Sequence, residues 1–191
     1  MKCVMISIQP KCVEKILSGE KKIEVRKTKP NIERPFKCYI YCTKGKTELP
    51  VERKINRELE DLCDRYEILY WANGKVIGEF ICDKINEYPF SWEDFTAYGI
   101  KRYRGLERHR KEMCLSLREI EEYACKNGHA EKLYGLHISD LKIYDQPKEL
   151  SEFWTIKCNN KKVKSCGDCE TKHCYKTITR PPQSWFYVEV E

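Results

Sequence analysis

The run Ser7-Ile-Gln-Pro-Lys-Cys-Val-Glu-Lys-Ile-Leu-Ser-Gly-Glu-Lys-Lys-Ile-Glu-Val-Arg26 decides the fold. An apolar strand, expected over residues 3–8, leads into it. Apolar side chains then recur at i, i+3 and i+4, which predicts a short amphipathic helix over residues 11–18. Gly19 ends this helix, and a second strand is expected over residues 22–26. The run therefore predicts a strand–helix–strand unit.

The second of these strands carries charged side chains. Successive residues of a strand point to opposite faces, so Glu24 and Arg26 share one face, while Ile23 and Val25 face a core. Lys21 comes just before the strand. A cation, a carboxylate and a guanidinium so close together predict a small polar pocket. Glu24 and Arg26 can recognise a ligand, or they can pair with each other as a structural ion pair.

The spacing Gly-x-Lys-x-x-Glu-x-Arg, from Gly19 to Arg26, resembles the signature of the ASCH domain, a branch of the PUA-like superfamily. The resemblance implies an α+β fold, a small mixed β pseudo-barrel with flanking helices, and a cleft for RNA, a nucleotide or a modified base. By position, Lys21 matches the functional lysine of the family. Three further blocks extend the resemblance: Lys37-Cys-Tyr-Ile-Tyr-Cys-Thr43, Val76-Ile-Gly-Glu-Phe-Ile-Cys82 and Thr179-Arg-Pro-Pro-Gln-Ser-Trp-Phe-Tyr-Val188.

The length favours one domain over residues 1–191, and the irregular order of strands and helices suits a small mixed barrel better than a layered α/β sheet. The resemblance implies that this domain is PUA-like. A helical insertion is expected at about 91–128, and a Cys-rich insertion at about 157–176. Within the first, Ser116 and Glu119 have the spacing of a capping box. Further strands are expected at 36–43, 66–71, 75–86, 133–144 and 184–190, a weak helix at 51–64 and a short helical piece at 148–152.

The composition is that of a globular protein with a heavily charged surface, since 41% of residues are hydrophobic and 35% charged. Basic residues gather in three clusters, at 21–37, 101–111 and 157–164. Each alone is typical of a solvated surface, but three clusters interleaved with aromatic residues favour a polyanion such as RNA. No stretch is long and apolar enough for a signal peptide or a membrane span, so we expect a cytoplasmic protein with no membrane partner.

Two other segments are predicted to contribute to the cleft. Glu79 is the one charged residue of an apolar strand, so it points to solvent or into the pocket; the resemblance places an acid on this strand. In the run 180–185, two prolines fix the backbone and hold Arg180 and Gln183 in set directions. Gln183 suits a base edge, and Trp185 can stack on a base. The alternative is a rigid turn with a core tryptophan.

Binding is the leading prediction, and catalysis in the same cleft is the alternative. Some ASCH proteins hydrolyse N4-acetylcytidine with a lysine, a threonine and a glutamate. The resemblance puts Lys21 and Glu79 on the lysine and glutamate, but Glu24 falls where the threonine would be, and a carboxylate would take a different reaction course. A ribonuclease using Lys21, Glu24 or Glu79 for proton transfer is a second enzymatic alternative. A protein-interaction module is the third.

The four histidines lie outside the signature blocks and are interpreted as ordinary surface or partly buried residues. They are His109, His129, His137 and His173.

Twelve cysteines do not predict a disulfide framework in a chain of this length without an export signal. Four fall in strand-like apolar runs, where reduced cysteine is a small core residue, and four others are predicted to be structural residues of helices. Four near the C-terminus, Cys158, Cys166, Cys169 and Cys174, include a Cys-x2-Cys pair and predict a structural zinc site, with His173 as a substitute ligand. The alternative is a basic loop with free thiols.

Overall fold

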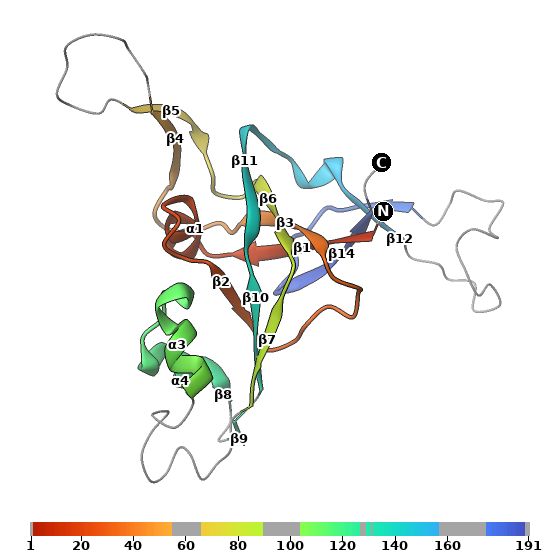
Figure 1. Cartoon of the computed structure of the whole chain (residues 1–191). Helices are drawn as coiled ribbons and strands as arrows, with labels where there is room; N and C mark the ends of the chain where they lie inside the picture. The colour runs from red at the N-terminus through yellow and green to blue at the C-terminus, as the bar shows by residue number, and fades with distance from the viewer. Residues whose placement is uncertain are drawn as a thin grey trace, which may run out of the picture. The chain divides into compact units, whose positions relative to one another are not determined.

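The computed structural model describes residues 2–54, 66–89, 104–126, 129–130, 132–156 and 175–189. The chain forms two compact units, each assembled from stretches that are far apart in the sequence. The first comprises Met1–Pro10, Cys38–Gly78 and Ile143–Glu191, and the second comprises Lys11–Lys37 and Glu79–Lys142. Figure 1 follows the helices and strands of both units along the chain.

The first unit is organised around β1 (Lys2–Ile8). This strand pairs in parallel with β3 (Phe36–Cys42) and antiparallel with β14 (Trp185–Glu189), so segments from the two ends of the chain lie side by side. The strand order of the whole sheet is β11-β6-β3-β1-β14-β12-β13. Its other members are β6 (Val76–Cys82), β11 (Ser139–Lys148), β12 (Trp154–Ile156) and β13 (Tyr175–Thr177), with the short 3-10 helix η2 (Leu150–Glu152) between β11 and β12.

The central strand β1 is buried on both faces, because every residue from Cys3 to Ile8 is buried. A strand covered on both faces has no polar side, which is why this segment is an unbroken apolar run apart from Ser7. The core around it is made of Cys3, Met5, Tyr39, Tyr41, Val76, Phe153, Ile178 and Val188.

A two-stranded ribbon of β4 (Pro50–Lys54) and β5 (Tyr66–Trp71) also belongs to the first unit. Residues 51–54 were predicted to be helical, and this prediction was wrong. The physical reason is cross-strand pairing: Val51 lies opposite Tyr70 and Arg53 opposite Glu67, a contact that the local sequence does not reveal. The remainder of the predicted helix, from residue 55 on, lies outside the described residues.

The second unit contains a three-stranded antiparallel sheet in the order β2-β10-β7. The strands are β2 (Ile23–Arg26), β10 (Leu133–His137) and β7 (Ile85–Tyr88). Gly135 in the central strand has no room for a side chain, because a Cβ there would lie 2.7 Å from the Ile23 side chain and 3.0 Å from the Tyr88 ring. The glycine thus lets β2 and β7 pack closely around β10.

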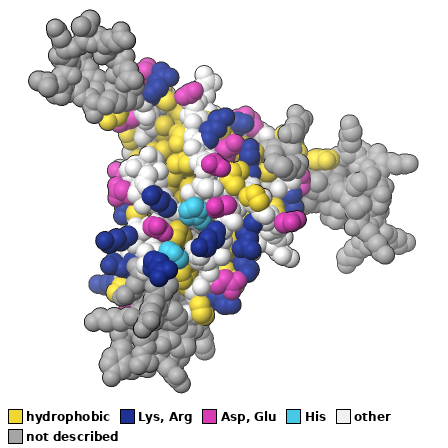
Figure 2. All heavy atoms as spheres, viewed as in Figure 1, with side chains coloured by type: hydrophobic (Ala, Val, Ile, Leu, Met, Phe, Trp, Pro, Cys, Tyr) yellow, Lys and Arg dark blue, Asp and Glu magenta, His cyan; other side chains and the backbone are white. Residues whose placement is uncertain are grey.

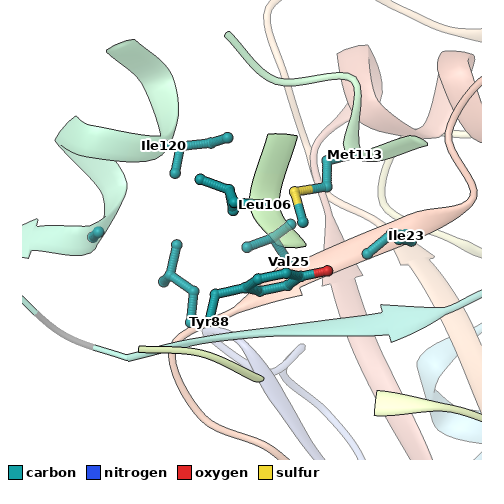
Figure 3. Packing of buried hydrophobic residues seen from close by; sticks show 8 residues of the cluster. Ile23, Val25, Tyr88, Leu106, Met113 and Ile120 are labelled. Carbon is teal, nitrogen blue, oxygen red and sulfur yellow. The ribbon is translucent and has the colours of Figure 1, made fainter. Parts of the chain in front are cut away.

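Three helices belong mainly to this unit: α1 (Pro10–Leu17), α3 (Arg104–Met113) and α4 (Leu117–Ala124). Side chains of α3 and α4 pack with those of the three-stranded sheet in one apolar cluster, part of which Figure 3 shows. It contains Ile23, Val25, Tyr88, Leu106, Met113, Ile120, Ala124 and Leu133. The short strands β8 (Cys125–Lys126) and β9 (His129–Ala130) pair with each other after α4.

The predicted α+β class is confirmed. In the described part of the chain the sheets are open, because each has two edge strands and none closes into a barrel. The strands predicted at 3–8, 22–26, 36–43, 66–71 and 184–190 are confirmed to within one or two residues. Those predicted at 75–86 and 133–144 each divide into two. β6 ends at Cys82 before β7 begins, and β10 ends at His137 before β11 begins.

Within the range predicted as a helical insertion, 91–128, the structure describes the two helices α3 and α4. Residues 90–103 and 127–128 lie outside the described part, and the insertion itself stays a prediction. The short helical piece predicted at 148–152 is η2. The predicted Cys-rich insertion lies almost entirely outside the described residues. None of the described helices has the length and apolar character needed to cross a membrane.

The capping box at the start of α4 should contribute measurably to stability. Ser116 Oγ accepts a hydrogen bond from Glu119 N at 3.2 Å, and Ser116 N donates to Glu119 Oε2 at 2.9 Å. Ser116→Ala removes the cap and should lower the free energy of unfolding by about 1 kcal/mol in urea titrations. The exposed Ser151, replaced in the same way, should change it by less than about 0.5 kcal/mol. Equal effects of the two substitutions would contradict the capping role.

The buried thiols of Cys42 and Cys82 should resist alkylation. Burial raises the pKa of each to about 12, and only the thiolate reacts. Cys42, Cys82 and Cys114 are free thiols, and Cys114 is partly exposed. After iodoacetamide treatment at mildly alkaline pH, peptide mass spectrometry should find Cys114 modified, and Cys42 and Cys82 modified only after unfolding in urea. Rapid modification of either buried thiol in the native protein would refute this.

Candidate functional site

The three charged residues of the signature lie together at β2 and are buried. Lys21 is 3% exposed, Glu24 6% and Arg26 8%. Glu24 Oε1 lies 2.8 Å from Arg26 Nη2, and Glu24 Oε2 lies 3.4 Å from Lys21 Nζ. One carboxylate therefore contacts two cations, and the formal charge of the cluster is positive. We call Lys21, Glu24 and Arg26 the β2 charge cluster.

The alternation predicted for β2 is confirmed for its apolar side, since Ile23 and Val25 belong to the apolar cluster with α3 and α4. The other side differs from the expectation of an open polar pocket. Glu24 and Arg26 are as buried as their apolar neighbours, so β2 is covered on both faces. The alternative of an ion pair between them is the arrangement that the structure contains.

Lys21 is buried because it closes the C-terminal end of α3. Its ammonium group donates a hydrogen bond to the carbonyl of Met113 at 2.7 Å, and the backbone N–H of Lys22 donates to Glu112 O at 2.8 Å. The last carbonyls of a helix have no partner within the helix and carry partial negative charge, so an ammonium group there is favourable. Cys114, with φ of 54°, then turns the chain away from the helix.

The carboxylate of Glu24 is not fully satisfied by hydrogen bonds. Its Oε2 atom is buried and accepts no hydrogen bond from any described residue, although Lys21 Nζ lies within ion-pair distance. A buried acceptor without a hydrogen bond is costly, by about 1–3 kcal/mol. The same atom is therefore suited to accept from a ligand donor.

Glu79, predicted to belong to the cleft, pairs with Lys37. Their side chains are 2.8 Å apart and both are partly buried. Both residues belong to the second unit, as the β2 charge cluster does. The structure thus provides Glu79 with a cation other than Lys21, and its role in the cleft stays a prediction.

Arg180, Gln183 and Trp185 belong to the first unit. Arg180 and Gln183 are exposed, and Trp185 packs edge-on against Tyr187 with ring centroids 5.4 Å apart. The diproline segment before Trp185 is fixed to β1, because Ser7 Oγ donates a hydrogen bond of 2.6 Å to the carbonyl of Pro182. The hydrogen bond holds this segment in place, and the role of Arg180, Gln183 and Trp185 in the cleft stays a prediction.

The cysteines predicted to bind zinc, Cys158, Cys166, Cys169 and Cys174, lie outside the described residues, as does His173. Within the described ranges, no group of three or more His, Cys, Asp or Glu side chains is placed to hold a metal ion. A structural zinc site in the Cys-rich segment stays a prediction.

The sequence interpretation missed a pocket of about 330 Å³ in the second unit. It is lined by Ile23, Asp83, Lys84, Asn86, Arg108, His109, Glu112 and His137. His137 Nδ1 lies 2.7 Å from Asp83 Oδ1, and this hydrogen bond is the main cause that lowers the pKa of Asp83. Histidine side chains lie on the surface among acidic and basic groups (Figure 2). The two pocket histidines are far apart in the sequence, so no local spacing indicated them.

No protein-family model matches the sequence, and the search of curated proteins gives no match. Among solved structures, the chain is similar to the crystal structure of ASCH from Zymomonas mobilis. The TM-score is 0.52 at 18% identity, over 97% of this chain and 87% of the other. The chain has the ASCH fold.

Two variants of the same Zymomonas mobilis protein give matching results. The ASCH variant with a tyrosine replaced by phenylalanine has a TM-score of 0.53 at 18% identity, over 97% of this chain and 89% of the other. The variant with a serine replaced by alanine has a TM-score of 0.52 at 17% identity, over 97% and 87%. The resemblance seen in the signature of this sequence therefore extends to the fold of nearly the whole chain.

The charge of Glu24 should be essential to the stability of the second unit. Glu24→Gln keeps the shape of the side chain but removes the negative charge that the buried Lys21 and Arg26 share. Breaking a buried ion pair in this way costs about 3–5 kcal/mol, so the urea unfolding midpoint should fall strongly. Glu14→Gln, on the exposed side of α1, provides the matched control and should stay within about 0.5 kcal/mol. Equal midpoints for the two variants would contradict the cluster.

Proposed function

We propose that this protein binds RNA or a nucleotide through its second unit, with the β2 charge cluster at the centre of the site. The observation that carries the proposal is the burial of three charged side chains at the signature positions of an ASCH fold. Replacing a buried ion pair by apolar residues of similar volume often leaves the stability of a protein unchanged or raises it. Stability alone therefore does not account for the cluster.

Each member of the cluster has a chemistry that suits a nucleotide. A lysine ammonium binds phosphate as a point charge, and a guanidinium binds phosphate or a carbonyl edge through two parallel hydrogen bonds. Glu24 can accept a hydrogen bond from an exocyclic amine of a base. Lys21 Nζ has N–H donors beyond the one bound to the carbonyl of Met113, but the residue is buried, so a ligand needs local movement around Lys21 to reach the ammonium.

Basic and aromatic side chains follow β2 on the same unit. Lys27 Nζ lies 5.4 Å from the ring centre of Tyr123, and Lys29 Nζ lies 5.3 Å from that of Tyr134. Lysines attract the phosphate backbone, and aromatic rings provide surfaces on which bases stack. This pairing supports a single-stranded nucleic acid as the ligand.

The geometry favours binding over the amidohydrolase alternative. Glu24 stands where the ASCH hydrolases have their threonine, and both of its oxygens face cations. A carboxylate held in this way is a poor nucleophile toward an amide. Incubation with N4-acetylcytidine, followed by chromatography of the products, should therefore leave the nucleoside intact.

RNA binding should depend on salt and on the lysines after β2. Fluorescence anisotropy with a short labelled single-stranded RNA should show saturable binding whose affinity falls as KCl rises. Each phosphate contact in a single strand contributes about 0.7 to the slope of log K against log salt. The double variant Lys27→Ala, Lys29→Ala should therefore lose about 1.4 from that slope.

The control for this titration is Arg53→Ala, which removes an exposed, ion-paired cation of the first unit. Its slope and affinity should match those of the unchanged protein. Absence of saturable binding to RNA and to nucleoside monophosphates alike would overturn the proposed function.

A further inference from the structure

The pocket of the second unit lies where β10 ends and β2 and β7 begin. His137 is the last residue of β10 and pairs with Ile23, the first residue of β2 and the one apolar residue of the lining. The backbone N–H of His137 donates to Lys84 O at 2.9 Å, which fixes the segment before β7 against β10. The other side of the pocket is α3, which supplies Arg108, His109 and Glu112.

Hydrogen bonds hold both sides of the pocket in place. Asp83 Oδ1 lies 2.7 Å from His137 Nδ1, and this hydrogen bond lowers the pKa of Asp83. Tyr88, whose ring lies in the apolar cluster (Figure 3), has its hydroxyl oxygen 2.7 Å from His109 Nδ1. The second hydrogen bond joins β7 to α3 beside the pocket. A site whose walls are fixed in advance loses less entropy when a ligand binds.

Two charges of α3 stay apart beside this pocket. Arg108 and Glu112 are four residues apart, yet they form no ion pair with each other or with any other described residue. Opposite charges at this spacing are neighbours on a helix and attract each other. On α4, Arg118 and Glu122 have the same spacing and order, and they do pair, with Arg118 Nε 2.8 Å from Glu122 Oε1. The α3 charges are therefore available to a ligand.

Lys84 completes the set of available charges. It is exposed, as Arg108 is, and the described part of the chain offers it no ion pair either. Glu112 is partly buried, and its backbone carbonyl accepts from Lys22 N at 2.8 Å, which fixes the start of its side chain. Asp83 is not in the set, because a histidine already occupies it. A ligand thus meets two positive charges and one negative charge.

The size and polarity of the pocket limit the class of ligand. Its volume of about 330 Å³ is at the lower end of the range for small-molecule sites. Its lining is polar apart from Ile23, and Asn86 adds a neutral hydrogen-bonding group. These properties fit a compact, charged molecule and exclude an apolar one.

We infer that this pocket binds a small acidic zwitterion, a molecule with one ammonium group and two negative charges, such as an acidic amino acid. Arg108 binds one anionic group through parallel hydrogen bonds, and Lys84 attracts the other as a point charge. Glu112 accepts hydrogen bonds from the ammonium group. The negative charges can belong to two carboxylates or to a carboxylate and a phosphate.

This inference goes beyond the proposed function and does not depend on it, since none of the three binding residues belongs to the β2 charge cluster. A molecule held by Lys84 on one side and by α3 on the other joins the sheet to the helix. Because it binds only the folded chain, it stabilises the second unit.

The test is isothermal titration calorimetry with the full chain, in a buffer free of amino acids and phosphate. L-Glutamate should bind saturably. Glutarate lacks the ammonium group and L-glutamine lacks the second carboxylate, so each should bind about 10-fold more weakly or worse, as expected when a hydrogen bond between charged groups is lost. O-Phospho-L-serine, titrated beside L-glutamate, shows by the tighter binding whether the second anionic group is a phosphate or a carboxylate.

Substitutions in α3 identify the binding residues. Arg108→Ala and Glu112→Gln should each weaken L-glutamate binding by about 10-fold or more. Glu112→Gln should also remove the preference for L-glutamate over glutarate, which a merely structural role of Glu112 would leave unchanged. Arg118→Ala and Glu122→Gln, which alter the paired charges of α4, are the matched controls and should keep full affinity.

Circular dichroism checks that each variant is folded. Three results would overturn the inference. They are the absence of saturable binding for both L-glutamate and O-phospho-L-serine, equal binding of L-glutamate and glutarate by the unchanged protein, and full affinity in the α3 variants.

Discussion

The second unit depends on one buried ammonium group. Lys21 Nζ lies between the carbonyl of Met113, at the end of α3, and the carboxylate of Glu24 on β2. A cation removed from water must keep such partners, because an unpaired buried charge costs several kcal/mol. Lys21 therefore joins the start of a strand to the end of a helix that lies 92 residues further along the chain.

This connection positions the β2 charge cluster and the pocket of the second unit. The end of α3 is held by Lys21 and by the backbone of Lys22, while Ile138 N donates to Lys22 O at 2.9 Å and brings the end of β10 to the same place. The side chains of α3 and the last residue of β10 then face one pocket. The signature lysine thus has a structural role beside the ligand-binding role that we propose for it.

Local sequence patterns predicted the elements better than the contacts between them. The strand–helix–strand run, the capping box at Ser116 and the alternation of β2 could be predicted because each depends on residues a few positions apart. The helical prediction for residues 51–54 failed because strand pairing with residues 66–71 outweighs local propensity. The split of the strands after Cys82 and His137 was missed for a similar reason, since the Asp83–His137 pair joins the two breaks.

The candidate site shows the same limit. The spacing of Lys21, Glu24 and Arg26 predicted that charges gather at β2, and the coordinates confirm this. Their burial could not be predicted, since Met113, whose carbonyl accepts the hydrogen bond of Lys21, is distant in sequence. The pocket histidines gave no local signal, because His109 and His137 lie on different elements.

A double-mutant cycle on Lys21 and Glu24 tests this account most directly. The free energy of unfolding would be measured in urea for Lys21→Met, Glu24→Leu and the double variant. The account predicts a coupling energy of about 1–3 kcal/mol between the two residues. The double variant should then lose less free energy of unfolding than the two single variants lose together. Losses that add within about 0.5 kcal/mol would show that the two groups act independently, and would contradict the buried ammonium as the connection between β2 and α3.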